Sequence, residues 1–193
     1  MHPSAPSPVS LAVISAGIGY ARPTRLLADQ ITESVCWSLT VGGARVEVEV
    51  LELCRLVTDF AHHSAMGHLS LDLREAIAAV AVADGLVVAT PVVVASPSDV
   101  FESFFGVIED GVLSGMPVLL AANSGSRWRP PELGRVIRGR FTCLHAEPVP
   151  TVVIAGPEDW EGPAHGCSNR LRERITQAAD ELVAAVSSPH TSG

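Results

Sequence analysis

The chain has 193 residues, of which 47% are hydrophobic, 18% charged and 5% aromatic, and its formal net charge is -8. This composition predicts one folded domain with an aliphatic core, and it excludes a disordered chain. The negative charge disfavours binding to nucleic acid or to an anionic membrane surface. All 13 basic residues are arginines, which excludes lysine chemistry such as Schiff-base formation. We therefore expect a small-molecule ligand.

The four cysteines show no C-x-x-C pair and no regular spacing, so neither a disulfide framework nor a metal site is predicted. They are Cys36, Cys54, Cys143 and Cys167. We expect reduced thiols in a cytoplasmic protein. No apolar run approaches the roughly 18 residues of a membrane span. Residues 9–187 are expected to form the domain, between disordered tails at residues 1–8 and 188–193.

The first apolar run, residues 10–15, predicts a buried strand, and the apolar spacing after Thr24 predicts a helix. Alternating valine and glutamate over residues 45–53 predict an outer strand. An irregular stretch with three histidines is expected next. These histidines, His62, His63 and His68, lack the i, i+4 spacing of a zinc hydrolase motif. They are expected to be solvated loop residues and not metal ligands.

The remaining pattern alternates regularly between helix and strand. Helices are predicted over residues 71–82, 99–112, 132–145 and 168–186, and strands over residues 86–89, 117–122 and 150–155. Five strands and five helices, with four of the strands almost wholly apolar, predict an α/β fold with a doubly wound parallel sheet covered on both faces. Ligands of such sheets bind beyond the carboxyl ends of the strands, at the topological switch point. The loops after the first, third and fourth strands therefore form the predicted site.

The first loop, residues 15–25, leads from a buried strand into a helix. It offers the hydroxyls of Ser15 and Thr24, the backbone of Gly17 and the guanidinium groups of Arg22 and Arg25. A helix N-terminus with arginines beside it suits a phosphate group. A loop with glycine is equally what a tight strand-to-helix turn needs, and the loop has neither a G-x-G-x-x-G nor a Walker pattern. This loop alone is therefore compatible both with phosphate binding and with a plain turn.

The second loop, residues 90–98, is apolar with hydroxyls at intervals, which suits a flat aromatic ring better than a charged ligand. The residues expected along that ring are Pro91, Val92, Val93 and Ser96. The alternative is that its prolines only make a turn rigid and that Ser98 or Asp99 only caps the next helix. The cap is expected in either case.

The third loop, residues 123–129, is polar and could clasp a nucleotide. The residues expected at the ligand's edge are Asn123, Ser124, Gly125 and Ser126. Arg127, Trp128 and Arg129 follow, and Trp128 suits a surface or a dimer interface equally well. Asp159 and Trp160, after the fifth strand, are expected in a surface loop or an interface.

Five segments carry a resemblance to a known family. They are Thr24-Arg25-Leu26-Leu27, residues 83–92 (ADGLVVATPV), residues 101–105 (FESFF), residues 115–122 (GMPVLLAA) and residues 157–160 (PEDW). Together they resemble the NADPH-dependent FMN reductase family, particularly the subgroup associated with flavin-dependent monooxygenases. The resemblance implies a flavodoxin-like homodimer with a five-stranded sheet of order 2-1-3-4-5. It also implies that the first loop holds the FMN phosphate and that the other two loops border the isoalloxazine ring.

The resemblance implies a reductase that uses NADPH or NADH and supplies reduced FMN to a partner monooxygenase, without a catalytic acid or base. All three loops depart from the family pattern; Arg22 and Pro23, for example, replace small hydroxyl residues. This motivates an alternative, a family member that has lost reductase activity and serves as a binding or assembly protein or catalyses another reaction. An electron-transfer flavodoxin is less favoured, because aromatic residues that could shield the ring are scarce.

Overall fold

The computed structural model describes residues 7–17, 22–93, 96–126, 132–160 and 166–188. The elements, in order, are β1 (Val9–Ser15), α1 (Arg22–Val41), β2 (Val46–Glu52), η1 (Leu53–Leu56), α2 (Val57–Met66), α3 (Leu71–Ala81), β3 (Gly85–Val93), β4 (Ser96–Pro97), α4 (Asp99–Val107), β5 (Pro117–Ser124), α5 (Leu133–Cys143), β6 (Glu147–Pro148), β7 (Val153–Ala155), η2 (Pro157–Asp159) and α6 (Asn169–Ser187). The predicted tails lie almost entirely outside the described residues. Within the described residues, no helix combines the length and the apolar character needed to cross a membrane.

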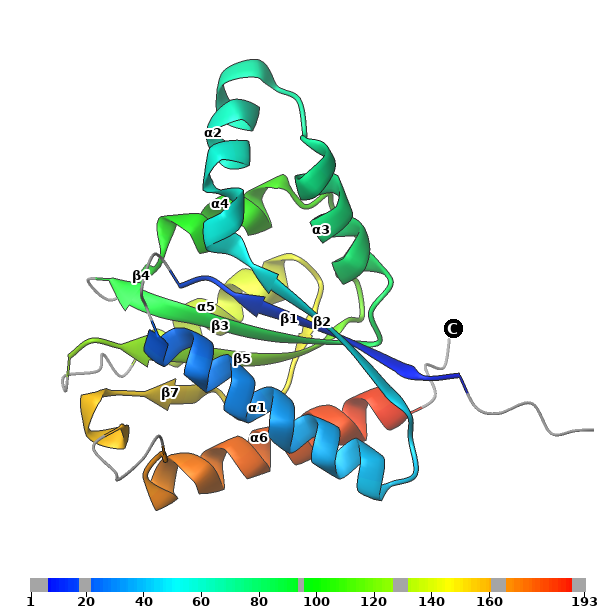
Figure 1. The fold of residues 1–193 in the computed structure, drawn as a ribbon, viewed down its shortest axis with the longest axis vertical. Helices are drawn as coiled ribbons and strands as arrows, with labels where there is room; N and C mark the ends of the chain where they lie inside the picture. Colours follow the sequence, from blue (N-terminus) through cyan, green and yellow to red (C-terminus); the bar gives the residue numbers. More distant parts are fainter. Residues whose placement is uncertain (1–6, 18–21, 94–95, 127–131, 161–165, 189–193) are drawn as a thin grey trace, which may run out of the picture.

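The strands form one twisted sheet in the order β2-β1-β3-β5, with β6 and β7 following each other beside β5 (Figure 1). All neighbours are parallel except the short β4, which pairs antiparallel with the end of β3. The predicted α/β fold and the order of its five main strands are therefore confirmed. The Val/Glu strand β2 lies at an edge, as its alternating pattern predicts.

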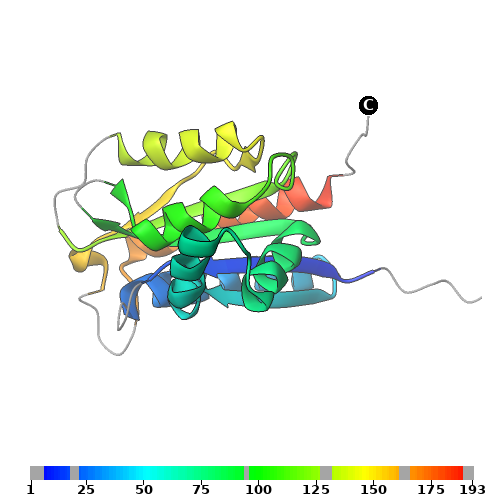
Figure 2. The same ribbon diagram turned by 90° about the horizontal axis from the view of Figure 1, so that it is seen from above.

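Two layers of helices cover the sheet (Figures 1 and 2). On one face α1 and α6 pack against each other and on the strands. On the other face lie α2, α3, α4 and α5. The core of this second face is not purely aliphatic as predicted, because all five phenylalanines of the chain are buried in it. They are Phe60, Phe101, Phe104, Phe105 and Phe141.

The helix α2 occupies the stretch that the sequence predicts to be irregular. Its buried side is supplied by Phe60, with Leu56 just before the helix, and Gly67 ends it in a left-handed conformation with φ of 72°. His62 and His68 are exposed, as expected, but His62 and His63 lie on the helix and not in a loop, and His63 is half-buried. Because only Leu56 and Phe60 face the core in this stretch, the sequence shows no helical period of apolar residues that would predict α2.

Two further boundaries differ from the prediction. The helix α4 ends at Val107 and not at residue 112, since the backbone of Ile108 is already extended. The strand predicted over residues 150–155 forms a ladder only at β7, with the two-residue β6 before it. Two prolines, Pro148 and Pro150, lack the N–H group that a continuous ladder needs, which explains the interruption.

Candidate functional site

The carboxyl ends of β1, β3 and β5 lie side by side at one edge of the sheet (Figure 1). Pro91 on β3 lies opposite Asn123 on β5, and Val92 lies opposite Ser124. The backbone N–H of Ala16, just after β1, donates to the carbonyl of Ala89 at 2.8 Å. The strand ends that precede the three predicted loops are therefore neighbours, at the switch point where the chain order of the strands reverses.

Thr24 lies in the first turn of α1 and is 0% exposed, yet its Oγ1 has no hydrogen-bond partner among the residues that the structure describes. A buried polar group without a partner costs about 1–3 kcal/mol. The first turn of α1 carries no acidic residue, and a helix N-terminus has free backbone N–H groups and a partial positive charge. A phosphate oxygen at this N-terminus would give the Thr24 hydroxyl a partner. The residues here therefore fit a phosphate group.

Arg25, predicted to lie near a phosphate, already has two carboxylate partners. Its Nε donates to Asp29 at 2.7 Å and its Nη1 to Glu52, and the hydrogen bond to Asp29 raises the pKa of the guanidinium. Glu52 also accepts from Arg55, at 3.1 Å. These pairs fasten α1 to the end of β2. The other predicted arginine, Arg22, has a helical backbone, but its side chain lies outside the description.

Ser98 joins the first and second loops. It is 1% exposed and caps α4, since its Oγ accepts from the N–H of Phe101 at 3.4 Å. The same Oγ donates to the carbonyl of Ala16 at 3.1 Å, and the Ser98 N–H lies 3.4 Å from the hydroxyl of Thr90. The predicted cap is confirmed at Ser98. Its bond to the first loop was missed, because local sequence carries no signal for a partner 82 residues away.

We expect Ser98→Ala to lower stability and to weaken FMN binding together. It removes the α4 cap, worth about 1 kcal/mol, and also deprives the Ala16 carbonyl of its donor. Ser70→Ala is the matched control, because Ser70 caps α3 in the same way, through the N–H of Leu73 at 3.1 Å, and has no bond to the first loop. Urea denaturation and flavin titration should show a loss of affinity for Ser98→Ala alone. Equal flavin affinity in both variants would refute the link.

Within the second predicted loop, the end of β3 pairs antiparallel with β4. β3 continues through Val93, beyond the predicted end at residue 89, and Val92 pairs with Pro97 in β4. β-Branched residues favour the extended conformation, which accounts for the longer strand. Pro91 and Val92 are half-buried, whereas the side chains of Val93 and Ser96 lie outside the description.

The third predicted loop begins two residues later than expected, because Asn123 and Ser124 are the last residues of β5. The Ser124 Oγ accepts from the N–H of Ser126 at 3.2 Å and donates to its carbonyl at 2.9 Å. This closes a tight turn in which Gly125 is exposed. Arg127, Trp128 and Arg129 lie outside the described residues.

Trp160 reaches the predicted site from the far end of β7. Its Nε1 donates to Oδ1 of Asn123 at 3.0 Å. Since this bond engages the amide oxygen of Asn123, the NH₂ group of the same amide is the part that can donate to a ligand. Asp159, next to it, is not in a surface loop as expected but 5% exposed, and it accepts from the N–H of Gly156 at 2.9 Å and from Ser168 Oγ at 2.8 Å. Trp160 was not predicted as a site residue, because its partner Asn123 lies 37 residues away in the sequence.

We expect Trp160→Phe to weaken FMN binding by a few-fold, because the Asn123 amide loses a hydrogen bond of about 1 kcal/mol and can rotate. The phenyl ring keeps most of the buried contact. Trp37→Phe is the control, since Trp37 is 72% exposed on α1. Fluorescence titration with FMN measures both. If the two variants bind FMN as the parent protein does, Asn123 does not depend on Trp160.

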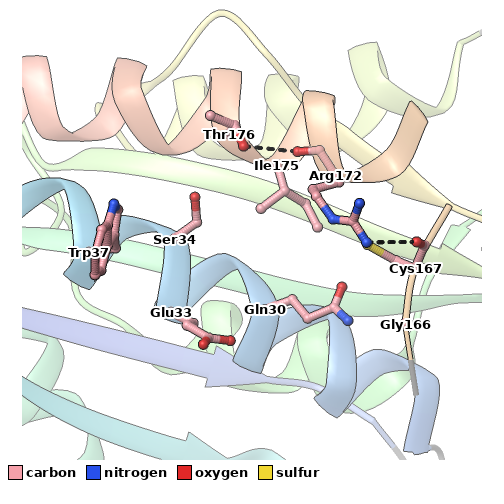
Figure 3. Close-up of a pocket in the computed structure, with 9 residues that line it drawn as sticks. All are labelled: Gln30, Glu33, Ser34, Trp37, Gly166, Cys167, Arg172, Ile175 and Thr176. Carbon is pink, nitrogen blue, oxygen red and sulfur yellow. Dashed lines mark hydrogen bonds between the residues drawn. The ribbon is translucent and has the colours of Figure 1, made fainter. Parts of the chain in front are cut away.

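A hollow of about 330 Å³ lies between α1 and α6 (Figure 3). Gln30, Glu33 and Trp37 on α1 face Arg172 and Thr176 on α6 across it. No residue predicted to bind the ligand lines it. It therefore belongs to the helical layer and not to the strand ends.

The model of one protein family, described as NADPH-dependent FMN reductase, matches residues 9–161. The chain belongs to this family. Similar family members include the NADH-dependent FMN reductase SfnE of Pseudomonas putida, 29% identical over 180 residues, which span 93% of this chain and 95% of SfnE. The FMN reductase (NADPH) of Pseudomonas aeruginosa is 27% identical over 174 residues, 90% of each chain.

Solved structures agree with the fold of this FMN reductase family member. An oxidoreductase from Corynebacterium diphtheriae is 35% identical with a TM-score of 0.85, covering 93% of this chain and 97% of that one. The apo form of an NADH:FMN oxidoreductase, EmoB, superimposes with a TM-score of 0.79 at 20% identity, covering 94% and 92%. An archaeal flavodoxin, at 10% identity, has a TM-score of 0.61 over 93% of this chain and 99% of its own. The flavodoxin-like architecture is thus confirmed.

Proposed function

We propose that this protein reduces FMN with NADH or NADPH and supplies the reduced flavin to a partner monooxygenase. The observation that carries the proposal is the buried Thr24 hydroxyl at the N-terminus of α1, which has no partner among the described residues and lies beside the strand ends where the resemblance implies the flavin site. The family match supports the reaction, and the relatives named as NADH- and NADPH-dependent support either donor. The monooxygenase partner follows from the resemblance of the sequence to that subgroup.

Each loop has a part in the proposed site. The residues proposed to hold the phosphate are Ser15, Gly17, Arg22, Thr24 and Arg25. Those proposed along the ring are Pro91, Val92, Val93 and Ser96, and those at its edge are Asn123, Ser124, Gly125 and Ser126. FMN, when bound, supplies the two-electron chemistry with the nicotinamide ring. The protein's own contribution is to hold the ligands in position, and this needs no side chain that transfers a proton.

We further propose a homodimer located in the cytoplasm. Apolar side chains exposed on the helices support association of two copies, notably Trp37 and Val41 on α1, Met66 on α2 and Leu71 on α3, which are 61–72% exposed. Light scattering on the purified protein measures the mass directly. A mass of about one chain at micromolar concentration would refute the dimer.

The proposed reaction is tested by steady-state oxidation of NADH and of NADPH in the presence of FMN or riboflavin. We expect turnover that depends on flavin and saturates at a lower concentration of FMN than of riboflavin, because only FMN has the phosphate. Oxidation of neither nicotinamide, with FMN bound, would instead favour the family member that has lost reductase activity.

A further inference from the structure

We propose that a second site for a phosphate or diphosphate lies in a groove at the β7 edge of the sheet, outside the flavin loops. The groove has a volume of about 640 Å³ and is lined by residues of α5, of β7 and the irregular segment before it, and of α6. Among the described residues that line it are three arginines, Arg135 and Arg138 from α5 and Arg174 from α6, and no aspartate or glutamate. In a chain of net charge -8, this is a local concentration of positive charge.

Two of these arginines are held in place by neutral acceptors. Arg138 donates from Nη1 to the carbonyl of Pro148 at 3.1 Å and from Nη2 to that of Pro150 at 2.5 Å. Arg174 donates from Nη2 to the carbonyl of Val152 at 2.8 Å. Backbone carbonyls fix the guanidinium groups without neutralising their charge. An anion that binds here meets cations already oriented, so little side-chain entropy is lost on binding.

Donors remain unused in the groove. The buried Nε of Arg174 has no partner, and Arg135 is exposed and has no hydrogen-bond or ion-pair partner among the described residues. Glu181 contacts two of the lining residues: its oxygens accept from the N–H of Thr151 at 2.6 Å, from Thr151 Oγ1 at 2.8 Å and from Gln177 at 3.2 Å. Glu181 is thus bound to neutral donors and makes no ion pair with the three arginines.

The ligand chemistry is that of a phosphate ester or diphosphate, because guanidinium groups bind its oxygens in pairs. Two sources present this chemistry, a separate phosphorylated molecule and the diphosphate of the nicotinamide donor. The groove extends to Ile154, next to Ala155, which pairs with Asn123 at the candidate site. That the diphosphate of the nicotinamide donor is the ligand rests on the proposed function, whereas the existence of the site does not.

The test is calorimetric titration of the full chain with inorganic pyrophosphate at constant ionic strength. We expect saturable binding that Arg135→Gln weakens about 10-fold, the loss of one charge-assisted contact. Arg135 is chosen because it makes none of the carbonyl bonds, so the fold is kept. Arg45→Gln, at an arginine whose side chain is 79% exposed beside the opposite edge strand, should bind as the parent protein does.

Thr24→Val serves as a second control, since it alters the proposed flavin phosphate site and should leave pyrophosphate binding intact. Absence of saturable binding, equal weakening by Arg45→Gln, or loss in Thr24→Val would overturn the proposal. Competition of pyrophosphate with NADH, together with a raised KM for NADH in Arg135→Gln at unchanged kcat, identifies the donor's diphosphate as the ligand. Binding without competition identifies a separate phosphorylated ligand. Because the titration needs no turnover, it can succeed or fail independently of the reductase assay.

Discussion

Thr24→Val should weaken FMN binding about 10- to 100-fold and leave riboflavin binding nearly unchanged. The substitution removes a buried hydroxyl that has no hydrogen-bond partner in the described part of the chain and replaces it with a methyl group of similar size. A hydrogen bond to a charged group contributes about 1.5–3 kcal/mol, and about 1.4 kcal/mol is tenfold in affinity. Riboflavin lacks the phosphate, so its affinity should not depend on the Thr24 hydroxyl. Fluorescence quenching with the two flavins measures both constants.

For the ligand-free protein we expect the opposite effect of Thr24→Val, namely no loss of stability. Removing an unsatisfied buried hydroxyl should leave the free energy of unfolding unchanged or raise it by about 1 kcal/mol. Thr32→Val is the matched control, because the Thr32 hydroxyl of the same helix already donates to the Ala28 carbonyl at 2.7 Å. That control should not alter FMN affinity. Equal losses for FMN and riboflavin in Thr24→Val would remove Thr24 from the phosphate site.

Phe101→Ala should cost about 3–5 kcal/mol of unfolding free energy, the largest stability loss that we expect of a single truncation here. Phe101 is 0% exposed, and its ring centroid lies 4.8 Å from that of Phe105 and 6.0 Å from that of Phe141. Since natural domains have only about 5–15 kcal/mol in total, the variant should be close to unfolding. Urea denaturation with an unchanged m value would attribute the loss to the folded state.

Phe101→Leu keeps most of the buried hydrocarbon and should cost clearly less than the alanine variant. The cap of α4 is kept in both variants, because the donor to Ser98 Oγ is the backbone N–H of residue 101. The stability loss therefore measures the packing of the ring alone. A loss below about 1 kcal/mol in the alanine variant would mean that the aromatic cluster can collapse around the cavity.

The layout of the fold could be predicted from the sequence, because apolar strands and amphipathic helices alternate with a clear period. The elements that escaped prediction are those whose signal is weak or not local. The helix α2 shows a single buried residue, Phe60, along its ten residues, and the broken strand near Pro150 depends on missing N–H groups. The aromatic core was missed because 5% aromatic content says nothing of where the rings gather.

The candidate site could be predicted only as far as local chemistry reaches. Thr24 and Ser98 were recognised by their places at helix starts, where hydroxyls act as ligands or caps. The bonds from Ser98 to Ala16 and from Trp160 to Asn123 arise from the tertiary fold, so no spacing in the sequence announces them. The pairing of Arg25 with Glu52 is of the same kind, since it joins α1 to the strand that follows it.

The most direct test of FMN binding and reduction is an anaerobic titration of the purified protein, first with FMN and then with NADH or NADPH. The flavin absorbance is recorded throughout. We expect saturable FMN binding, tighter than riboflavin binding, and rapid bleaching of the flavin when the nicotinamide donor is added. Failure to bind FMN more tightly than riboflavin, or binding with no bleaching by either donor, would contradict this expectation.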